Sequence, residues 1–365
     1  MKELKEITKE LEKLNLKRYP NQELLRAWDA ADELIIQKMQ TMELEGLKII
    51  IVNDAFGALT RYFQHLDVTT YIDSYLSLSA LRLNNPIKKF KLISELDDIK
   101  ENYDLIVIKI PKNLSFLREI LNKFSSLSPK SNFISAGMAK YLTRNTYNLY
   151  THSFKDANIS LTQKKAKLIF SSDAIKIQKN KINFKEVLID KYPYKVINYS
   201  NIFSREKLDI GTRFLLENLP QNNYKYVLDL GCGNGILGIN LKNKQSDAIV
   251  YFSDESKMAI QSANQNYNLY FKDKAHFFWT HSTLGIKQKF DLVICNPPFH
   301  QNNTIMKGIA INMFKDSKKV LLQFGALRVV ANRHLNYHIV LKKIYGNVKL
   351  INQNSKFVIL ESIKK

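Results

Sequence analysis

The sequence has little cysteine, no long apolar run and a shortage of acidic residues. Its two cysteines, Cys232 and Cys295, are too few for a disulfide framework, so a reducing setting fits. There is no run of about 18 apolar residues, which excludes a membrane-spanning helix. The first residues alternate lysine with glutamate and lack the apolar segment of a secretory signal. We therefore expect a cytoplasmic protein without a membrane partner.

The shortage of acidic residues leaves a formal net charge of +21, and this charge is unevenly spread. Residues 1–100 hold 15 basic and 16 acidic side chains, residues 101–200 hold 17 and 7, and residues 301–365 hold 12 and 2. Such a distribution favours a polyanion as the partner. The alternative is a lysine-rich composition that only keeps the protein in solution.

The length and the order of apolar segments indicate an α/β protein of two domains. A chain of 365 residues is too long for one ordinary core. From about residue 201, short apolar strands alternate with helical spacing, which predicts a parallel sheet covered by helices on both faces. Strands are expected at residues 226–230, 248–252, 276–279, 290–294, 320–324, 327–331 and 356–360, and a helix at 258–266.

The first half shows a weaker version of the same order, with strands expected at residues 47–52, 70–72 and 103–108. Three landmarks pair between the halves: Asn53 with Asp229, Asp73 with Asp254, and Pro111 with Pro297. Their constant order favours an internal duplication over the general likeness of any two α/β domains. We therefore predict two tandem Rossmann-like domains, at residues 1–185 and 186–365.

On this pairing the first domain is degenerate. It has Ala55 and Leu59 in place of Gly231 and Gly235, and Ile110 in place of Asn296. Added Cβ atoms crowd a loop that a ligand must approach, and isoleucine offers no acceptor. We expect this domain to support the fold or to contact RNA. The candidates for phosphate contacts are Lys109, Lys112, Lys164, Lys165 and Lys167, although for any single one of them a plain solvated surface lysine is the favoured interpretation.

A glycine-rich loop follows the strand at 226–230, in the order Asp229-Leu230-Gly231-Cys232-Gly233-Asn234-Gly235. Its G-x-G-x-G spacing differs from the G-x-G-x-x-G of dinucleotide-binding proteins. Glycines at 231, 233 and 235 let a ligand approach the backbone. The Asp229 carboxylate would repel a pyrophosphate and suits a cationic ligand. Asp254 ends the next strand, where a carboxylate can accept both hydroxyls of a ribose, so we predict S-adenosylmethionine as the cofactor.

The adenine contact is harder to predict. In this fold the third strand usually supplies an acidic or amide side chain there, and residues 279–282 have none. His281 or Ser282 could take the role, and an ordinary surface histidine is the alternative.

The tetrapeptide Asn296-Pro297-Pro298-Phe299 follows the fourth strand, at the edge of the sheet where ligands bind in open α/β folds. An exocyclic amine of a base is a poor nucleophile because its lone pair is delocalised into the ring. The Asn296 side-chain oxygen and the Pro297 carbonyl can accept its hydrogens, and Phe299 can stack on the base. This pattern predicts methylation of an exocyclic amine. A plain turn at Asn-Pro is the alternative.

The two cysteines raise the question of a nucleophilic cysteine mechanism. Because Cys295 ends a strand and Cys232 lies inside the glycine-rich loop, we interpret both as small buried residues. No metal is expected.

Several segments together give the chain a resemblance to the ribosomal RNA guanine-N2 methyltransferases, and most closely to their large-subunit branch. The segments span nearly the whole chain and are residues 28–33, 52–59, 203–205, 208–211, 229–235, 296–301 and 330–335. The resemblance implies a duplicated methyltransferase fold whose C-terminal copy alone binds the cofactor. It implies methyl transfer to the 2-amino group of one guanine in 23S ribosomal RNA. It also implies that Phe203 and the residues up to Gly211 pack over the cofactor and the target base.

Other substrates remain open on the residues alone. Asn-Pro-Pro-aromatic also serves enzymes that methylate small-subunit rRNA guanine, DNA adenine N6 or a protein glutamine amide. A non-catalytic ribosome assembly factor with a relic site is a further alternative. The duplicated layout is compatible with a monomer.

Overall fold

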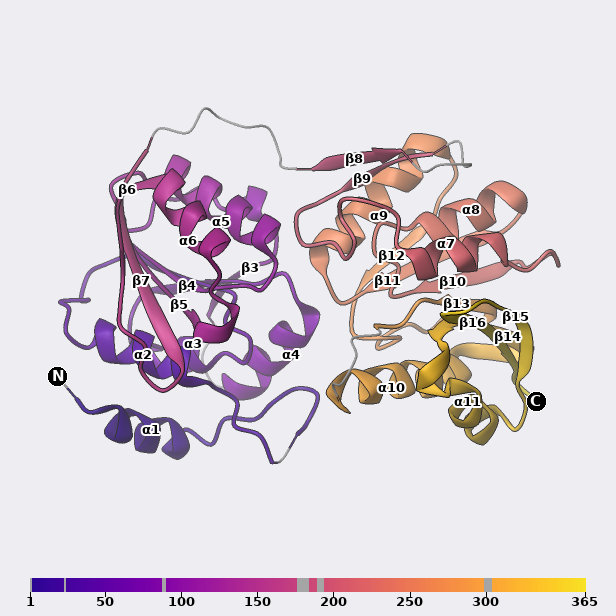
Figure 1. The fold of residues 1–365 in the computed structure, drawn as a ribbon, viewed down its shortest axis with the longest axis horizontal. Helices are drawn as coiled ribbons and strands as arrows, with labels where there is room; N and C mark the ends of the chain where they lie inside the picture. Colours follow the sequence, from indigo (N-terminus) through magenta and orange to yellow (C-terminus); the bar gives the residue numbers. More distant parts are fainter. Residues whose placement is uncertain (1, 23, 87–89, 176–183, 189–193, 299–303) are drawn as a thin grey trace. The chain divides into compact units, whose positions relative to one another are not determined.

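The structure is a computed structural model that describes residues 2–22, 24–86, 90–175, 184–188, 194–298 and 304–365. The chain divides into two compact units, Met1–Asn183 and Phe184–Lys365 (Figure 1). Within the described residues, no helix is long and apolar enough to cross a membrane.

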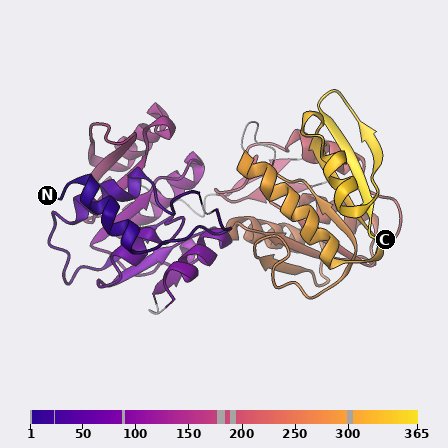
Figure 2. The same cartoon turned by 90° about the horizontal axis from the view of Figure 1, so that it is seen from below.

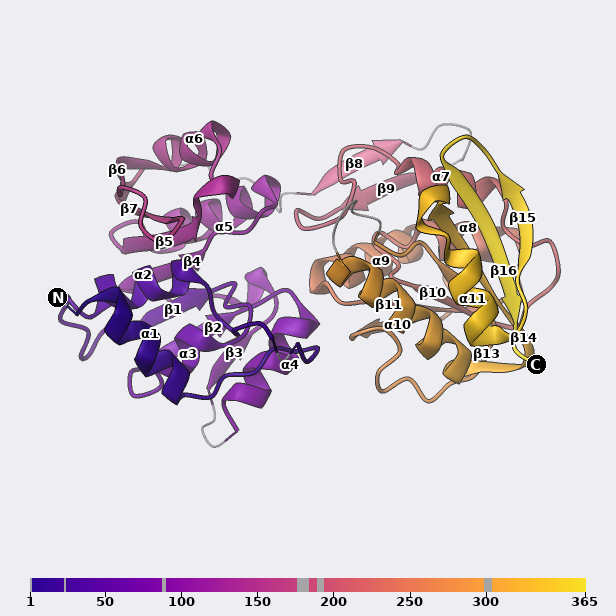
Figure 3. The same ribbon diagram turned by 60° about the horizontal axis from the view of Figure 1, so that its bottom comes forward.

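The first unit is built on a seven-stranded sheet of order β3-β2-β1-β4-β5-β7-β6. Its strands are β1 Ile49–Val52, β2 Val68–Tyr71, β3 Lys91–Ile93, β4 Leu105–Lys109, β5 Asn132–Met138, β6 Phe154–Ile159 and β7 Ala166–Ala174. Its helices are α1 Leu4–Lys13, α2 Ala30–Met39, α3 Ala58–Tyr62, α4 Tyr75–Asn84, α5 Leu114–Leu127 and α6 Arg144–Ser153, with 3₁₀ turns η1 Leu96–Asp98 and η2 Ala139–Tyr141. Figure 3 shows α1 on one side of this sheet, with α5 and α6 on the other.

The second unit repeats that topology in the sheet β12-β11-β10-β13-β14-β16-β15. Its strands are β10 Tyr226–Leu230, β11 Ile249–Asp254, β12 His276–Trp279, β13 Phe290–Cys295, β14 Leu321–Asn332, β15 Lys349–Gln353 and β16 Phe357–Ile363, and β8 Lys185–Leu188 pairs with β9 Lys195–Asn198 as a separate hairpin. Its helices are α7 Ile210–Glu217, α8 Ile236–Lys244, α9 Lys257–Tyr270, α10 Thr304–Val320 and α11 Tyr337–Tyr345, with the 3₁₀ turn η3 Arg333–Leu335. The β15–β16 hairpin forms one edge of the sheet (yellow in Figure 2).

The two sheets share one strand order, and this confirms the prediction of tandem Rossmann-like domains. In each sheet the first five strands run parallel, and the strand pairing β5–β7 or β14–β16 is antiparallel. Parallel central strands are buried on both faces, which explains continuous apolar runs such as Ile49–Val52. Their carboxyl ends meet at one edge of each sheet, where ligands bind in this class of fold.

The two faces of the second sheet carry different apolar clusters. Leu292, Ile294 and Val330 pack with Leu215 of α7 and with helices α8 and α9. The alternate residues of β13 and β14 pack on the other face against α10 and α11. Side chains of successive strand residues point to opposite faces, so each side chain at the carboxyl edge can be assigned to a face.

The C-terminal strand predictions need one correction. Residues 320–324 and 327–331 were expected as two strands separated by a turn, but they form the single strand β14. Its pairing with β13 shifts register between Phe290 and Leu292, and Phe324 adopts a φ of 63°. The expected turn is therefore a bulge inside a continuous strand.

Candidate active site

The glycine loop, residues 231–235, connects β10 to α8 at the carboxyl edge of the second sheet. Gly233 has a φ of +55°, and a Cβ built there would meet nothing within 4 Å, so this part of the backbone is open to a ligand. Gly235 has a φ of +82° and is the N-cap of α8. A Cβ at Gly235 would lie 3.1 Å from the Cα atom of Ala263, so close packing against α9 also requires glycine there.

Asp229 is fully buried beneath the glycine loop. Its Oδ2 atom accepts a hydrogen bond of 2.9 Å from the Gly238 backbone N–H in the first turn of α8. Its Oδ1 atom is buried and has no hydrogen-bond partner among the described residues. Burial raises the pKa of Asp229 to about 8. A cationic ligand group beside this unpartnered oxygen would favour the ionised carboxylate, so the open glycine loop above Asp229 fits such a ligand.

Asp254 lies at the end of β11 and supports the glycine loop directly. One carboxylate oxygen accepts from the Gly233 N–H at 2.9 Å, and the other accepts from the Ser256 N–H at 3.0 Å. These two bonds fix the carboxylate beside the glycine loop, and its contact with a ribose stays a prediction.

The two candidates for the adenine contact follow β12. His281 is partly buried, and burial lowers the pKa of its imidazole. Ser282 has a φ of 54°, and its Oγ atom is buried without a hydrogen-bond partner in the described chain. An unsatisfied hydroxyl makes Ser282 the better placed of the two for a polar ligand contact.

Asn296 directly follows β13 and is held by Thr212 of α7 and by the residue that caps this helix, Asp209. Its Nδ2 group donates to the Thr212 hydroxyl at 2.7 Å and to Asp209 Oδ2 at 3.2 Å. Because both partners are acceptors here, they set which end of the amide faces them. The Oδ1 atom of Asn296 is thereby turned away, and it is buried without a partner among the described residues.

The helix start explains how Asp209 comes to lie there. Asp209 is the N-cap of α7, and its Oδ2 atom accepts from the Thr212 N–H at 2.8 Å. The same carboxylate oxygen therefore caps the helix and orients Asn296. Asp209 lies in one of the segments that carry the family resemblance, but neither its role in orienting Asn296 nor that of Thr212 was predicted. The pattern Asp-x-x-Thr before a helix was the available signal.

Asn198 links the glycine loop to the segment that precedes α7. The Asn234 amide donates to Asn198 Oδ1 at 2.9 Å, and the Asn198 amide donates to the Arg205 carbonyl at 2.9 Å. Phe203 lies in this segment with its side chain 64% exposed. Its contact with cofactor or base stays a prediction. In the catalytic loop, residues 296–299, Pro297 is buried and Phe299 lies outside the described residues.

The first unit shows which residues stand at the equivalent positions, and it corrects the predicted pairing. The Asn53 N–H donates to Tyr71 at the end of β2, just as the Gly231 N–H donates to Ser253 on β11. Asn53 has a φ of 65° and Gly231 a φ of 71°. Asn53 therefore occupies the place of Gly231, not that of Asp229, which is taken by Ile51.

The same register corrects the prediction for the glycines. Gly57 has a φ of +73° and is the N-cap of α3, so it occupies the place of Gly235, which the prediction gave to Leu59. Ala55 then stands in the place of Gly233 rather than Gly231. The second pair of landmarks shifts as well. Ser74 and Ser256 each cap the helix that follows them, so they occupy equivalent places. The residue two positions before Ser74 is Ile72, so Ile72, and not Asp73, is the equivalent of Asp254.

Lys109 occupies the place of Asn296, which the prediction gave to Ile110. Val52 pairs with Ile108 as Leu230 pairs with Cys295, so the next residues, Lys109 and Asn296, are equivalent. The Lys109 ammonium lies 2.7 Å from Asp29 Oδ1 and 2.7 Å from Asp32 Oδ1. Asp29 is the N-cap of α2.

The catalytic-loop position of the first unit is thus filled by an ion triad in which Lys109 and Asp32 are buried and Asp29 is half-buried. Lys109 is only 9% exposed, so its prediction as a phosphate contact is wrong. Asp32 is also buried, and burial raises the pKa of its carboxyl group above its usual range. The Lys109 ammonium group is a donor only, so the residue in the place of Asn296 offers no acceptor to an amine.

The other lysine candidates differ from one another. Lys164 is exposed, yet its ammonium lies 2.8 Å from Glu33 Oε2. Lys112 and Lys165 are exposed, and Lys167 is half-buried. Lys112 lies over the Tyr141 ring, with its ammonium 4.4 Å from the ring centroid. Contact of these lysines with RNA stays a prediction.

Both cysteines are free and buried, as the sequence indicated. Burial raises the pKa of both thiols, Cys232 and Cys295, so neither is set up as a nucleophile.

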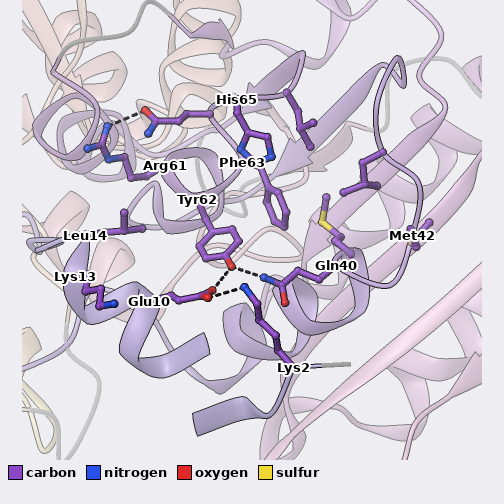
Figure 4. A pocket seen from close by; sticks show the side chains of 14 residues that line it. Lys2, Glu10, Lys13, Leu14, Gln40, Met42, Arg61, Tyr62, Phe63 and His65 are labelled. Carbon is purple, nitrogen blue, oxygen red and sulfur yellow. Dashed lines mark hydrogen bonds and ion pairs between the residues drawn. The ribbon is translucent and has the colours of Figure 1, made fainter. Parts of the chain in front are cut away.

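A separate pocket of about 600 Å³ lies in the first unit, between α1, α2 and α3 (Figure 4). On its wall the Tyr62 hydroxyl donates to Glu10 and accepts from Gln40. The hydrogen bond with Lys2 is the largest cause that lowers the pKa of Glu10. These polar groups bind one another, and the pocket contains none of the predicted site residues.

Family models match both units. Residues 193–361 match the methyltransferase small domain, and residues 4–174 match the RLMG N-terminal domain. The strand order, the glycine loop and the Asn-Pro-Pro sequence at the end of β13 define an S-adenosylmethionine-dependent methyltransferase of the Rossmann-like class.

Similar proteins narrow this class to one family. The chain is 39% identical to "Ribosomal RNA large subunit methyltransferase G" of Psychromonas ingrahamii, over 96% of this chain and 97% of that protein. It is 39% identical to the protein of the same name from Pseudoalteromonas atlantica, with the same coverage. A T. Thermophilus 16S rRNA N2 methyltransferase, solved with AdoMet and guanosine, shares the fold with a TM-score of 0.77 and 18% identity over 92% of each chain. The chain belongs to the ribosomal RNA large subunit methyltransferase G family.

Proposed function

We propose that the protein transfers a methyl group from S-adenosylmethionine to the exocyclic 2-amino group of one guanine in large-subunit (23S) ribosomal RNA. The names of relatives that are 35–39% identical over nearly the whole chain support the reaction and the RNA. The observation that carries the chemistry is the orientation of Asn296, whose amide nitrogen is bound by Thr212 and Asp209 while its oxygen is left unpartnered.

The cofactor would be held at the glycine loop. We propose that Gly231, Gly233 and Gly235 provide the close backbone approach and that Asp229 faces the cationic end of the cofactor, with Asp254 accepting the ribose hydroxyls. The unpartnered Asp229 oxygen and the open space at Gly233 support this assignment. S-adenosylmethionine supplies a methyl group on a sulfonium sulfur when bound. Phe203 would cover the cofactor from the segment before α7.

The protein's own groups would activate the amine by accepting its hydrogens. Asn296 Oδ1 and the Pro297 carbonyl would each accept one N–H, which localises the nitrogen lone pair toward the methyl carbon. The bound cofactor would supply the methyl carbon to the amine nitrogen, leaving its sulfur as a neutral thioether, and the nitrogen would then release one proton to solvent. Most of the rate would come from holding the amine in line. Phe299 would stack on the base.

The two halves would have different roles. We propose that residues 186–365 bind the cofactor and catalyse, and that residues 1–185 contact RNA and support the fold. Ile51, Ala55 and Lys109 at the places of Asp229, Gly233 and Asn296 support the absence of cofactor binding in the first half. We further propose that the protein acts as a monomer in the cytoplasm and needs no metal.

The direct test is methylation of naked 23S rRNA by the purified protein with labelled cofactor, followed by primer extension to map the modified base. We expect one modified guanine in 23S rRNA, with no label in 16S rRNA, DNA or a release factor offered in parallel. Transfer to one of those other substrates would contradict the proposal. Cofactor binding without any transfer would instead identify a non-catalytic assembly factor.

A further inference from the structure

Asn332, the last residue of β14, is a buried amide whose role the proposed reaction leaves unexplained. Its side chain is 7% exposed, and its Oδ1 atom has no hydrogen-bond partner in the described part of the chain. Buried polar atoms are nearly always hydrogen-bonded, because leaving an acceptor unpaired in the interior is unfavourable. An exception at a ligand-binding edge indicates an acceptor that awaits a ligand.

The register of the sheet places Asn332 close to the catalytic loop. Strands β13 and β14 are parallel neighbours, with Cys295 opposite Val329. Ile294 and Val330 both pack on the face of α7. Because side chains alternate along a strand, Asn296 and Asn332 continue the rows of Ile294 and Val330 on that face. The bond between Asn296 and Thr212 of α7 agrees with this assignment.

The strand order also separates Asn332 from the cofactor. The sheet runs β11-β10-β13-β14, and the residues expected to hold the cofactor lie on β10, on β11 and in the glycine loop. Asn296 follows β13 and Asn332 ends β14, so Asn332 lies on the far side of Asn296 from the cofactor. That position is on the substrate side of the catalytic loop.

The degenerate first unit supplies an internal comparison. Ile108 pairs with Ser135 as Cys295 pairs with Val329, and 3₁₀ turns begin at Ala139 and Arg333. Met138 therefore stands at the place of Asn332, and it packs against the apolar cluster of the first unit. The unit that lacks the Asn296 amide also lacks the second amide.

We propose that Asn332 is a base-binding residue that selects guanine, with its Oδ1 atom accepting the N1–H of the target base. This inference rests on the proposed function. Guanine carries an N–H donor at N1 beside its 2-amino group, whereas adenine and cytosine carry a ring acceptor beside theirs. Two neighbouring acceptors, Asn296 and Asn332, match the two adjacent donors of guanine and disfavour the other bases.

The test compares guanine with 2-aminopurine, which keeps the 2-amino group and lacks the N1–H. Synthetic 23S rRNA fragments carry one or the other at the mapped target position, and single-turnover methylation is measured for wild type and N332L. Leucine preserves the size of asparagine and removes the acceptor. We expect N332L to methylate the guanine fragment about ten- to a hundredfold more slowly. Its rate on the 2-aminopurine fragment should not fall below that of wild type, because the variant also loses the repulsion between the Asn332 oxygen and the ring N1.

A second variant and two controls separate the outcomes. N332D keeps an acceptor at the same place. Because only the ionised carboxylate accepts with both oxygens, N332D should recover guanine methylation as the pH is raised. The same variant provides the test if N332L is unstable. Asn240 is another buried amide with an unpartnered Oδ1, but it lies within α8, and N240L should keep the preference for guanine. If N332L slows both fragments equally or neither, the role of Asn332 is refuted. If wild type itself methylates neither fragment, the proposed function fails, whereas full activity of N296A would refute only the acceptor role of Asn296.

Discussion

At the scale of single residues, the direction of one side-chain amide decides the chemistry of the site. Asn296 could present either its oxygen or its nitrogen to a base, and only the oxygen can accept from an amine. Thr212 and Asp209 make the choice by accepting from the nitrogen. This arrangement predicts that Thr212 acts on the reaction through Asn296 and not by touching the base.

A double-mutant cycle tests this dependence. N296A should lower kcat by about a hundredfold or more while the cofactor Kd stays unchanged, comparable to the loss of one oxyanion-hole donor. T212V should lower kcat by about five- to tenfold because the amide loses one acceptor. In the N296A background T212V should have almost no further effect, and T212S should restore the rate. Independent, multiplicative effects of the two substitutions on single-turnover rates would contradict the argument.

For Lys109 in the first unit we expect the opposite, namely that its substitution lowers the stability of the protein and leaves catalysis unchanged. K109M would leave Asp29 and Asp32 facing each other without their cation. Removing one partner of a buried ion pair lowers the free energy of unfolding by about 3–5 kcal/mol. Urea unfolding measures this loss, and cofactor affinity should stay the same. K91M, at an exposed lysine, is the control that should change little. Equal stability of K109M and wild type would show that the triad contributes nothing.

At the scale of elements, the two units use the same glycine to begin the same helix. Gly57 and Gly235 both have a positive φ at the N-cap, and an added Cβ would lie 2.9 Å from Leu81 Cα or 3.1 Å from Ala263 Cα. The backbone at both places therefore requires glycine for packing, whether or not a ligand binds there.

The pair of variants G57A and G235A separates packing from ligand binding. Each should lower the free energy of unfolding by about 1–3 kcal/mol because of backbone strain. Only G235A should also weaken S-adenosylmethionine binding, as measured by calorimetry, since only the second unit keeps Gly233 and Asp229. A G57A variant with weakened cofactor binding would show that the first unit takes part in the cofactor site.

The elements also show what the sequence could and could not predict. Residues 226–230 and 276–279 were predicted with their observed bounds, because apolar runs that end at glycine or polar residues leave little choice. The pairing of the halves was wrong by one or two residues. Asn53 was paired with Asp229 because both are polar residues near the end of a strand. Its positive φ shows that Asn53 is the equivalent of Gly231, and this backbone angle cannot be predicted from the residue type.

The candidate site was predictable in the same partial way. The glycine loop and the Asn-Pro-Pro motif are local in sequence, so their spacing could be recognised. Asp209 lies 87 residues from Asn296, and the hydrogen bond between them exists only once α7 packs on the sheet. The position of Asn332 near the catalytic loop likewise follows only from the pairing of β14 with β13, which the sequence does not show.

At the scale of the whole molecule, the charge of +21 predicts how RNA binding depends on salt. Lysine contacts to phosphates release counterions, so the logarithm of the RNA affinity should fall linearly with that of the salt concentration. The slope should be about −0.7 per phosphate contact with single-stranded RNA. Filter binding of a 23S rRNA fragment between low and moderate salt measures it, with cofactor affinity as the insensitive control. A flat dependence would contradict the electrostatic role of the lysines.

The ion triad of the first unit also bears on how the duplication diverged. K109N alone would restore the amide but leave two carboxylates, Asp29 and Asp32, without a counter-charge. In the first unit Asp32 is the equivalent of Thr212. A working amide would therefore need Lys109 and Asp32 to change together. If Asn332 binds the base, Met138 would have to change as well. Each single reversal passes through a less stable protein. The three charged residues of the triad therefore depend on one another, and restoring an amide at this place needs coordinated changes rather than one substitution.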